Sequence, residues 1–237
     1  KVEELLSGSV RAFMGRDESL ARRVIEADAQ VNRLEVDIDE LCLCILARRQ
    51  PVASDLRFIA TALKLVKDLE RIGDLGVNIC ERALELLLEP PLRIPPAVES
   101  MASVALAMVH DALDAFVADD PGKATQVIER DRVVDAACGE VFELLLHQMT
   151  ADASIIGRAT RVQSVVKALE RVGDHATNLA EMVVFMVHGQ DIRHAELLGE
   201  GSAPALRVAS LLFVSGGSGA RSQMAEAIAR ARLPSFV

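Results

Sequence analysis

A ten-residue segment occurs twice in this chain, and its spacing decides the fold. The stretch LVKDLERIGD at residues 65–74 returns as VVKALERVGD at residues 165–174, one hundred positions later. The asparagine and the glutamate that follow each copy keep the same offset: Asn78 and Glu81, then Asn178 and Glu181. A constant offset over this many positions is the signature of an internal duplication. The sequence therefore predicts two copies of one structural unit.

Each copy is predicted to form three helices. In residues 97–118 the apolar side chains Val98, Met101, Val104 and Met108 recur at the spacing of an amphipathic helix. Prolines, glycines and aspartates separate such segments and mark where helices end. The predicted helices are 1–15, 18–49 and 53–88 in the first copy and 97–118, 122–149 and 153–188 in the second. We expect an all-α protein of two tandem three-helix bundles, residues 1–90 and 97–189.

The first helix is shorter than its counterpart in the second copy. When Phe13 is aligned with Phe116, the first copy lacks about one or two helical turns at its start. We expect the chain to begin inside this helix, with an N-terminal segment missing.

Composition limits the classes of partner. The 237 residues are 51% hydrophobic and only 3% aromatic, which favours helices packed through Leu, Val, Ile, Ala and Met over a β-sandwich or barrel. The net charge of −9 argues against a nucleic-acid partner, because phosphate backbones are bound by clustered Lys and Arg. Cations are the expected small partners.

The sequence also predicts a cytoplasmic location. No apolar run approaches the roughly 18 to 20 residues that cross a bilayer, and no signal-peptide pattern opens the chain. The four cysteines lie inside helical patterns and not at the spacings of a secreted disulfide framework, so we expect them to be reduced. They are Cys42, Cys44, Cys80 and Cys138.

Acidic residues recur on one side of the predicted helices. At 100° per residue, the four oxygen-bearing residues of the repeated motif fall within an arc of roughly 80°. They are Glu70, Asp74, Asn78 and Glu81 in the first copy and Glu170, Asp174, Asn178 and Glu181 in the second. The middle helices carry a second row, which comprises Asp28, Asn32, Glu35 and Asp39 and which Asp131 and Asp135 begin in the second copy. Each copy thus contributes two acidic rows.

Carboxylates stacked along a helix favour a bound cation. Like charges at i,i+4 cost a few tenths of a kcal/mol per pair. Oxygen ligands suit Mg²⁺, Mn²⁺ or iron, and zinc less well. Two other interpretations stay open at this point. Acidic residues on helix exteriors are commonly solvated surface, and Arg71 and Arg171 beside the rows could screen the repulsion without a metal.

The repeated segments resemble the PhoU family. ERIGDLGVNICE at residues 70–81, ERVGDHATNLAE at residues 170–181 and PVASDLR at residues 51–57 match the pattern of that family, and the resemblance covers about residues 1–190. It implies two three-helix bundles with E/DxxxD motifs that hold multinuclear metal clusters. It also implies a regulator, and not an enzyme, that acts in phosphate uptake and phosphate-starvation signalling. The implied partners are the ATPase of a Pst-type phosphate ABC transporter and a sensor histidine kinase. The protein would then be peripheral to the membrane, and a homodimer is among the expected assemblies.

The motifs of the family, carried over residue by residue, give the candidate metal ligands. These are Asp28, Asn32, Glu70, Asp74 and Glu81 in the first copy and Asp131, Asp135, Glu170, Asp174 and Glu181 in the second. Asn32 stands where an acid would strengthen the first site, although its amide still offers a carbonyl oxygen. The resemblance implies transition-metal clusters with iron as the first choice and zinc, manganese or magnesium as alternatives.

Other candidate ligands are weaker. Cys138 takes the place of Glu35 on the acidic row of the second copy, where a thiolate would bind a softer metal, but a buried apolar cysteine is the commoner role. We expect His175 on the surface or in a groove. His110 and His147 lie among apolar residues and are expected in the core or at its boundary.

The C-terminal segment, residues 204–237, changes character. An apolar run of strand type, a Gly-rich loop and a helical stretch resemble the truncated opening of low-molecular-weight tyrosine phosphatases and arsenate reductases, whose loop reads Cys, five residues, Arg, Ser. Ser215 replaces the nucleophilic cysteine, so we expect no covalent catalysis. An intact loop could still bind phosphate through its backbone N–H groups together with Ser215, Arg221 and Ser222.

Rival functions come from different classes. A ferritin-like di-iron oxidase would also be a bundle rich in carboxylates, but it requires ExxH motifs, and the sequence contains none. A metal-free helical adaptor is the stronger competitor, because a contact surface requires no bound ion. Metal analysis of the purified protein separates the metal-free adaptor from the metal-binding regulator.

Overall fold

The chain folds into long α-helices, as the sequence predicts. The computed structural model describes residues 1–189, and no strand occurs within them. The helices are α1 (Val2–Gly15), α2 (Glu18–Arg49), α3 (Ala53–Leu87), α4 (Pro96–Ala118), α5 (Pro121–Ala151) and α6 (Ile156–His188), with a 3-10 turn at Ala153–Ile155. The expected all-α fold of two three-helix repeats is therefore confirmed.

The same local signals start the middle helix of each repeat. The Asp17 carboxylate caps α2 by accepting a hydrogen bond from the backbone N–H of Leu20 at 2.9 Å. The Asp120 carboxylate caps α5 by accepting from the backbone N–H groups of Gly122 and Lys123. Each side chain satisfies donors that the first turn of a helix leaves without partners. The sharp reversal between the first two helices of each repeat is therefore encoded locally.

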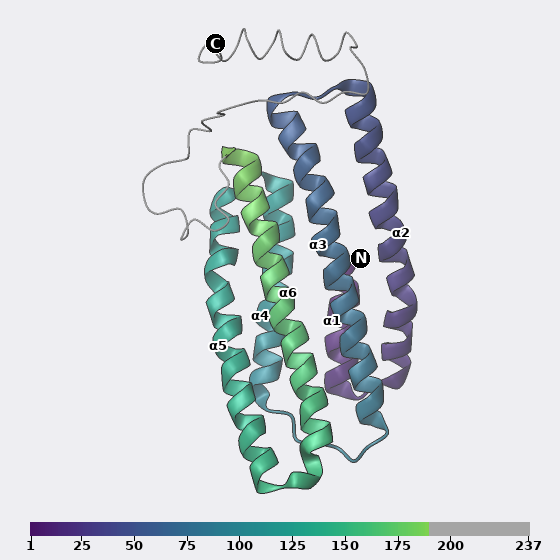
Figure 1. Ribbon diagram of the computed structural model, residues 1–237, viewed down its shortest axis with the longest axis vertical. Coiled ribbons are helices and arrows are strands. Elements are labelled where there is room, and N and C mark those ends of the chain that lie inside the picture. The colour runs from purple at the N-terminus through teal and green to yellow at the C-terminus, as the bar shows by residue number, and fades with distance from the viewer. Residues whose placement is uncertain (190–237) are drawn as a thin grey trace, which may run out of the picture. The chain divides into compact units, whose positions relative to one another are not determined.

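The two repeats meet along α3 and α6. Figure 1 shows α1, α2 and α3 on one side and α4, α5 and α6 on the other, with α3 and α6 adjacent in the middle. These two helices run antiparallel, because Asp68 contacts His175 whereas Glu85, further along α3, contacts Arg161, earlier on α6. The long third helices of the repeats thus form the junction of the molecule.

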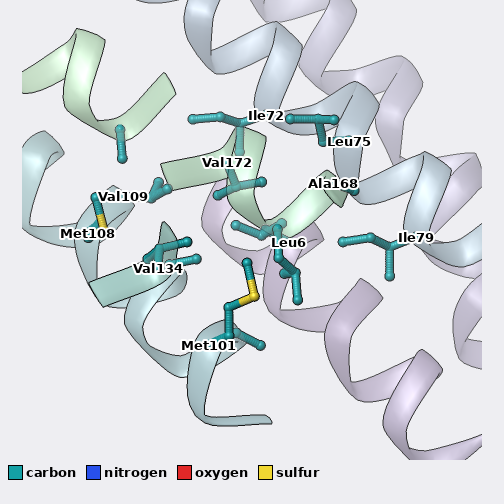
Figure 2. Close-up of a cluster of buried hydrophobic side chains, with 14 of the residues drawn as sticks. Leu6, Ile72, Leu75, Ile79, Met101, Met108, Val109, Val134, Ala168 and Val172 are labelled. Carbon is teal, nitrogen blue, oxygen red and sulfur yellow. The ribbon is translucent and has the colours of Figure 1, made fainter. Parts of the chain in front are cut away.

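One hydrophobic core extends across both repeats. Figure 2 shows Leu6, Ile72, Met101, Val134 and Val172 converging from α1, α3, α4, α5 and α6, and each of these side chains is at most 1% exposed. Burial of one such side chain stabilises a fold by about 1.5–3 kcal/mol. Much of α2 lies outside this core and packs through a smaller cluster that includes Val24 and Val31. Of the two helices of the first repeat that carry acidic rows, α2 is thus the one less tied to the main core.

Helix α4 is long and apolar enough to cross a membrane by length and composition alone, whereas we expected no such segment. Its eight buried residues include Met101, Ala105 and Met108, which are packed in the main core. Packing at the centre of the bundle accounts for the apolar composition of this helix.

The predicted phosphatase-like segment, residues 204–237, lies outside the described residues. The phosphate-binding residues Ser215, Arg221 and Ser222 lie there too.

Candidate functional site

In the first repeat, the structure places the acidic row of α2 against the acidic row of α3. The carboxylate of Asp28 packs over Gly73, where a Cβ atom would lie only 3.1 Å from Asp28 Oδ1. Asp74 is close enough for its negative charge to raise the pKa of Asp28, after the larger effect of burial. Asp28 Oδ1 is buried and has no hydrogen-bond partner, while Oδ2 accepts from the amide of Asn32 at 3.0 Å. The first candidate site therefore contains a carboxylate oxygen without a partner.

The second repeat builds the same arrangement from α5 and α6. Asp131, which is Asp28 displaced by 103 positions, packs over Gly173, where a Cβ atom would lie 3.2 Å from Asp131 Oδ1. That oxygen is also buried and has no hydrogen bond of good geometry, although the Thr177 hydroxyl is near enough to act against the rise in the pKa of Asp131. The duplication has thus preserved a glycine on one helix and an unpartnered carboxylate oxygen on its neighbour.

Charge is concentrated most strongly in the second repeat. Burial, followed by the negative charges of Asp135 and Asp174, raises the pKa of Asp131 to about 6. Burial and the charges of Glu170 and Asp135 raise the pKa of Asp174. These four carboxylates therefore lie close enough together to oppose one another's ionisation, as like charges sharing one site do.

Lysines balance part of this charge. Lys67 Nζ lies 2.7 Å from Glu35 Oε1 and bridges α3 to α2, and Lys167 Nζ lies 2.6 Å from Glu170 Oε1. Both lysines belong to the repeated segment, one hundred positions apart, so the duplication itself was the signal that could have identified them.

The structure does not bring all of the predicted metal ligands together. Asn32 contacts Asp28, and Asp28 lies near Asp74 on the neighbouring helix. In the second repeat, Asp131 lies near Asp135, Glu170 and Asp174. Glu81 lies further along α3, is exposed and has Arg82 at 3.7 Å, while Glu181 occupies the matching place on α6. Over residues 1–189, no three His, Cys, Asp or Glu side chains are grouped closely enough to hold a metal ion in their present rotamers.

The weaker candidates divide between core and surface. Cys138 is buried, and burial raises the pKa of its thiol, which disfavours the thiolate that a metal requires. His175 is partly buried, and its Nδ1 lies 2.7 Å from Asp68 Oδ1 across the repeat junction. The core prediction for His110 and His147 is wrong, because both are exposed. His110 lies on the face of α4 that meets α1, where Glu3 binds it.

Comparison with known proteins agrees with this duplicated arrangement. The PhoU domain matches residues 1–83 and 98–183, once for each set of three helices. The chain belongs to the PhoU family. The resemblance inferred from the repeated segments is thereby confirmed.

Relatives from the PhoU family align over most of the chain. It is 38% identical over 193 residues to the phosphate-specific transport system accessory protein PhoU of Escherichia coli K12, covering 81% of this chain and 80% of that protein. It is 41% identical to the homologue of Pseudomonas aeruginosa over 197 residues, covering 83% and 81%. These relatives are named as accessory proteins, in agreement with a regulator that is not an enzyme.

Solved PhoU structures share the fold. The crystal structure of PhoU from Pseudomonas aeruginosa superimposes with a TM-score of 0.77 at 40% identity, covering 80% of this chain and 91% of that one. The phosphate transport system regulatory protein PhoU from Streptococcus pneumoniae superimposes with a TM-score of 0.75 at 27% identity, covering 80% and 89%.

Proposed function

We propose that this protein is a metal-binding accessory regulator of a phosphate-specific transport system. Membership of the PhoU family and the names of its relatives support the transport role. The metal-binding role depends on one observation, which is the buried carboxylate oxygen without a partner in each repeat, at Asp28 and at Asp131. A buried polar atom without a hydrogen bond is costly, and a bound cation would remove that cost.

The residues present fit a hard or borderline metal ion. The acidic rows offer mainly carboxylate oxygens, the ligand type that iron, manganese and magnesium accept. Gly73 and Gly173 let the carboxylates of the neighbouring helix approach the backbone of α3 and α6. Burial and mutual repulsion raise the pKa of Asp131 and Asp174, and a cation would neutralise the repulsion. Iron is the metal that we propose first, with zinc, manganese and magnesium as alternatives.

The proposed partners are the ATPase of the phosphate ABC transporter and a sensor histidine kinase of phosphate starvation. Relatives that are named accessory proteins of phosphate transport support the first partner. Contact with a membrane transporter from the cytoplasm would make the protein peripheral to the membrane. A homodimer is part of the same proposal, and light scattering of the purified chain measures it.

Elemental analysis of protein purified without chelator tests the metal sites. We expect more than one transition-metal equivalent per chain, and we expect Asp74→Ala with Asp174→Ala to remove metal while the helical circular dichroism stays unchanged. Glu40→Ala with Glu143→Ala removes two exposed carboxylates from outside the candidate ligand set and is the matched control. Equal metal content in both double variants would refute the site assignment.

A metal-free helical adaptor is the second candidate function. The ion pairs Lys67–Glu35 and Lys167–Glu170 favour it, because they balance acidic charge without a metal. A pulldown with the transporter ATPase decides between the two: capture by both metal-loaded and chelator-treated protein supports the adaptor. Capture by the loaded protein alone supports a metal-dependent regulator.

A further inference from the structure

A pocket of about 410 Å³ opens between the two repeats, beside the acidic row of α6. Its walls come from α3 and α6, the antiparallel pair at the centre of Figure 1. Arg82, Lys167 and Arg171 line it together with the amide side chain of Asn78. No aspartate or glutamate is among the described residues that line this pocket. On a chain of net charge −9, three cationic side chains thus line one pocket, although Arg82 is paired with Glu85 at 2.8 Å.

The duplication provides an internal comparison for this pocket. One hundred positions away, the matching face of the junction has Asp68 and His175 where the pocket has Ala168 and Leu75. His175 Nδ1 and Asp68 Oδ1 lie 2.7 Å apart and occupy that face themselves. The pocket lacks this carboxylate, because alanine stands in its place. One face of the junction is thus filled by the Asp68–His175 pair, whereas the other contains a pocket lined by cationic side chains.

The arginines of the repeated motif differ in the same way. Arg71 pairs with two acids of its own helix, at 3.2 Å from Asp74 and 3.6 Å from Glu70. Its counterpart Arg171 is exposed, lines the pocket and has no carboxylate within ion-pair distance in residues 1–189. Lys167 pairs with Glu170, which lies outside the pocket lining. Arg171 is therefore the cation most available to a ligand.

We propose that this pocket binds a phosphoryl anion, either inorganic phosphate or the phosphate group of a small ester. Guanidinium groups present paired N–H donors that match phosphate oxygens. The Asn78 amide can both donate and accept, which suits monohydrogen phosphate, whereas sulfate has no proton to give. The volume is within the range of small-molecule sites and leaves room for more than one phosphate group. The choice of phosphate among anions rests on the proposed function.

Calorimetric titration of the full chain with inorganic phosphate tests this site. We expect saturable binding that persists after chelator treatment, because the pocket residues are not proposed metal ligands. Arg171→Gln should weaken the affinity at least tenfold, whereas Arg71→Gln, its counterpart in the first repeat, should leave the affinity within twofold. Ala168→Asp introduces the carboxylate of the matching face and should weaken binding as strongly, with an unchanged helical spectrum as the control for folding.

Three results would overturn the proposal. They are equal affinity of the wild type and Arg171→Gln, equal affinity for sulfate, and loss of phosphate binding on chelation. A parallel titration with adenosine monophosphate identifies the source of the phosphoryl group, and tighter binding than that of inorganic phosphate would support an ester. The ATPase pulldown measures partner binding and is independent of the phosphate titration. A failure of the proposed anion site is therefore distinguishable from a failure of the transport role.

Discussion

At the scale of single residues, the close contact between α1 and α2 depends on one missing side chain. A Cβ atom at Gly8 would lie 2.8 Å from Val24 Cγ2, and the short, β-branched valine cannot move away easily. We expect Gly8→Ala to destabilise the protein by about 1–3 kcal/mol, since overpacking outweighs the gain in helix propensity. Urea unfolding followed by circular dichroism measures the change.

Gly139 gives the matched control for this substitution. It lies in α5, is exposed, and an added Cβ atom would meet nothing within 4 Å. Gly139→Ala should therefore stabilise the protein by about 0.5–1 kcal/mol, which is the helix propensity difference alone. A stabilising effect of both substitutions would show that α1 and α2 are not in close contact at Gly8.

At the scale of helices, one aspartate starts the middle helix of each repeat. Asp17 and Asp120 accept hydrogen bonds from backbone N–H groups of the first turn of α2 and α5. Replacement of either by alanine should cost about 1 kcal/mol in the free energy of unfolding. Asp17→Asn and Asp120→Asn keep an accepting oxygen and should restore most of the loss. Failure of asparagine to restore it would assign the effect to charge and not to capping.

The contact between α1 and α4 predicts a pH dependence. The hydrogen bond with Glu3, together with the charge of Asp114, raises the pKa of His110 above its ordinary value of 6.5. The stabilisation by this pair is therefore complete below about pH 6.5 and is lost as the pH rises through the raised folded-state value. We expect Glu3→Gln to lower the pKa of His110 in an NMR titration. An unchanged pKa would show that Glu3 does not bind His110 in solution.

Helices were more predictable from the sequence than the contacts between them. The repeat offset, the apolar spacing and the prolines, glycines and aspartates between helices are local signals, and they specified the helices correctly. Which acid meets which counter-charge depends on neighbouring helices, so the pairing of Lys67 with Glu35 was not visible in either segment alone. His110 was misplaced for the same reason, because its partner Glu3 belongs to another helix.

At the scale of the whole molecule, the two repeats are joined by packing and by charge. Ile72 of α3 and Val172 of α6 are fully buried in one continuous core. At one end of the same junction, Arg161 of α6 binds Glu85 at 2.9 Å and Glu89 at 2.8 Å. Exposed or half-exposed ion pairs contribute little each, so the apolar core supplies most of the coupling.

Such a shared core predicts cooperative unfolding of the two repeats. Chelator-treated protein should unfold in urea in a single transition, followed by circular dichroism because the chain has no Trp or Tyr. Ile72→Ala should cost about 2–5 kcal/mol and should reduce amide-exchange protection in α6 as well as in α3, since its cavity opens onto both repeats. If protection fell only in the first repeat, the two bundles would be independent.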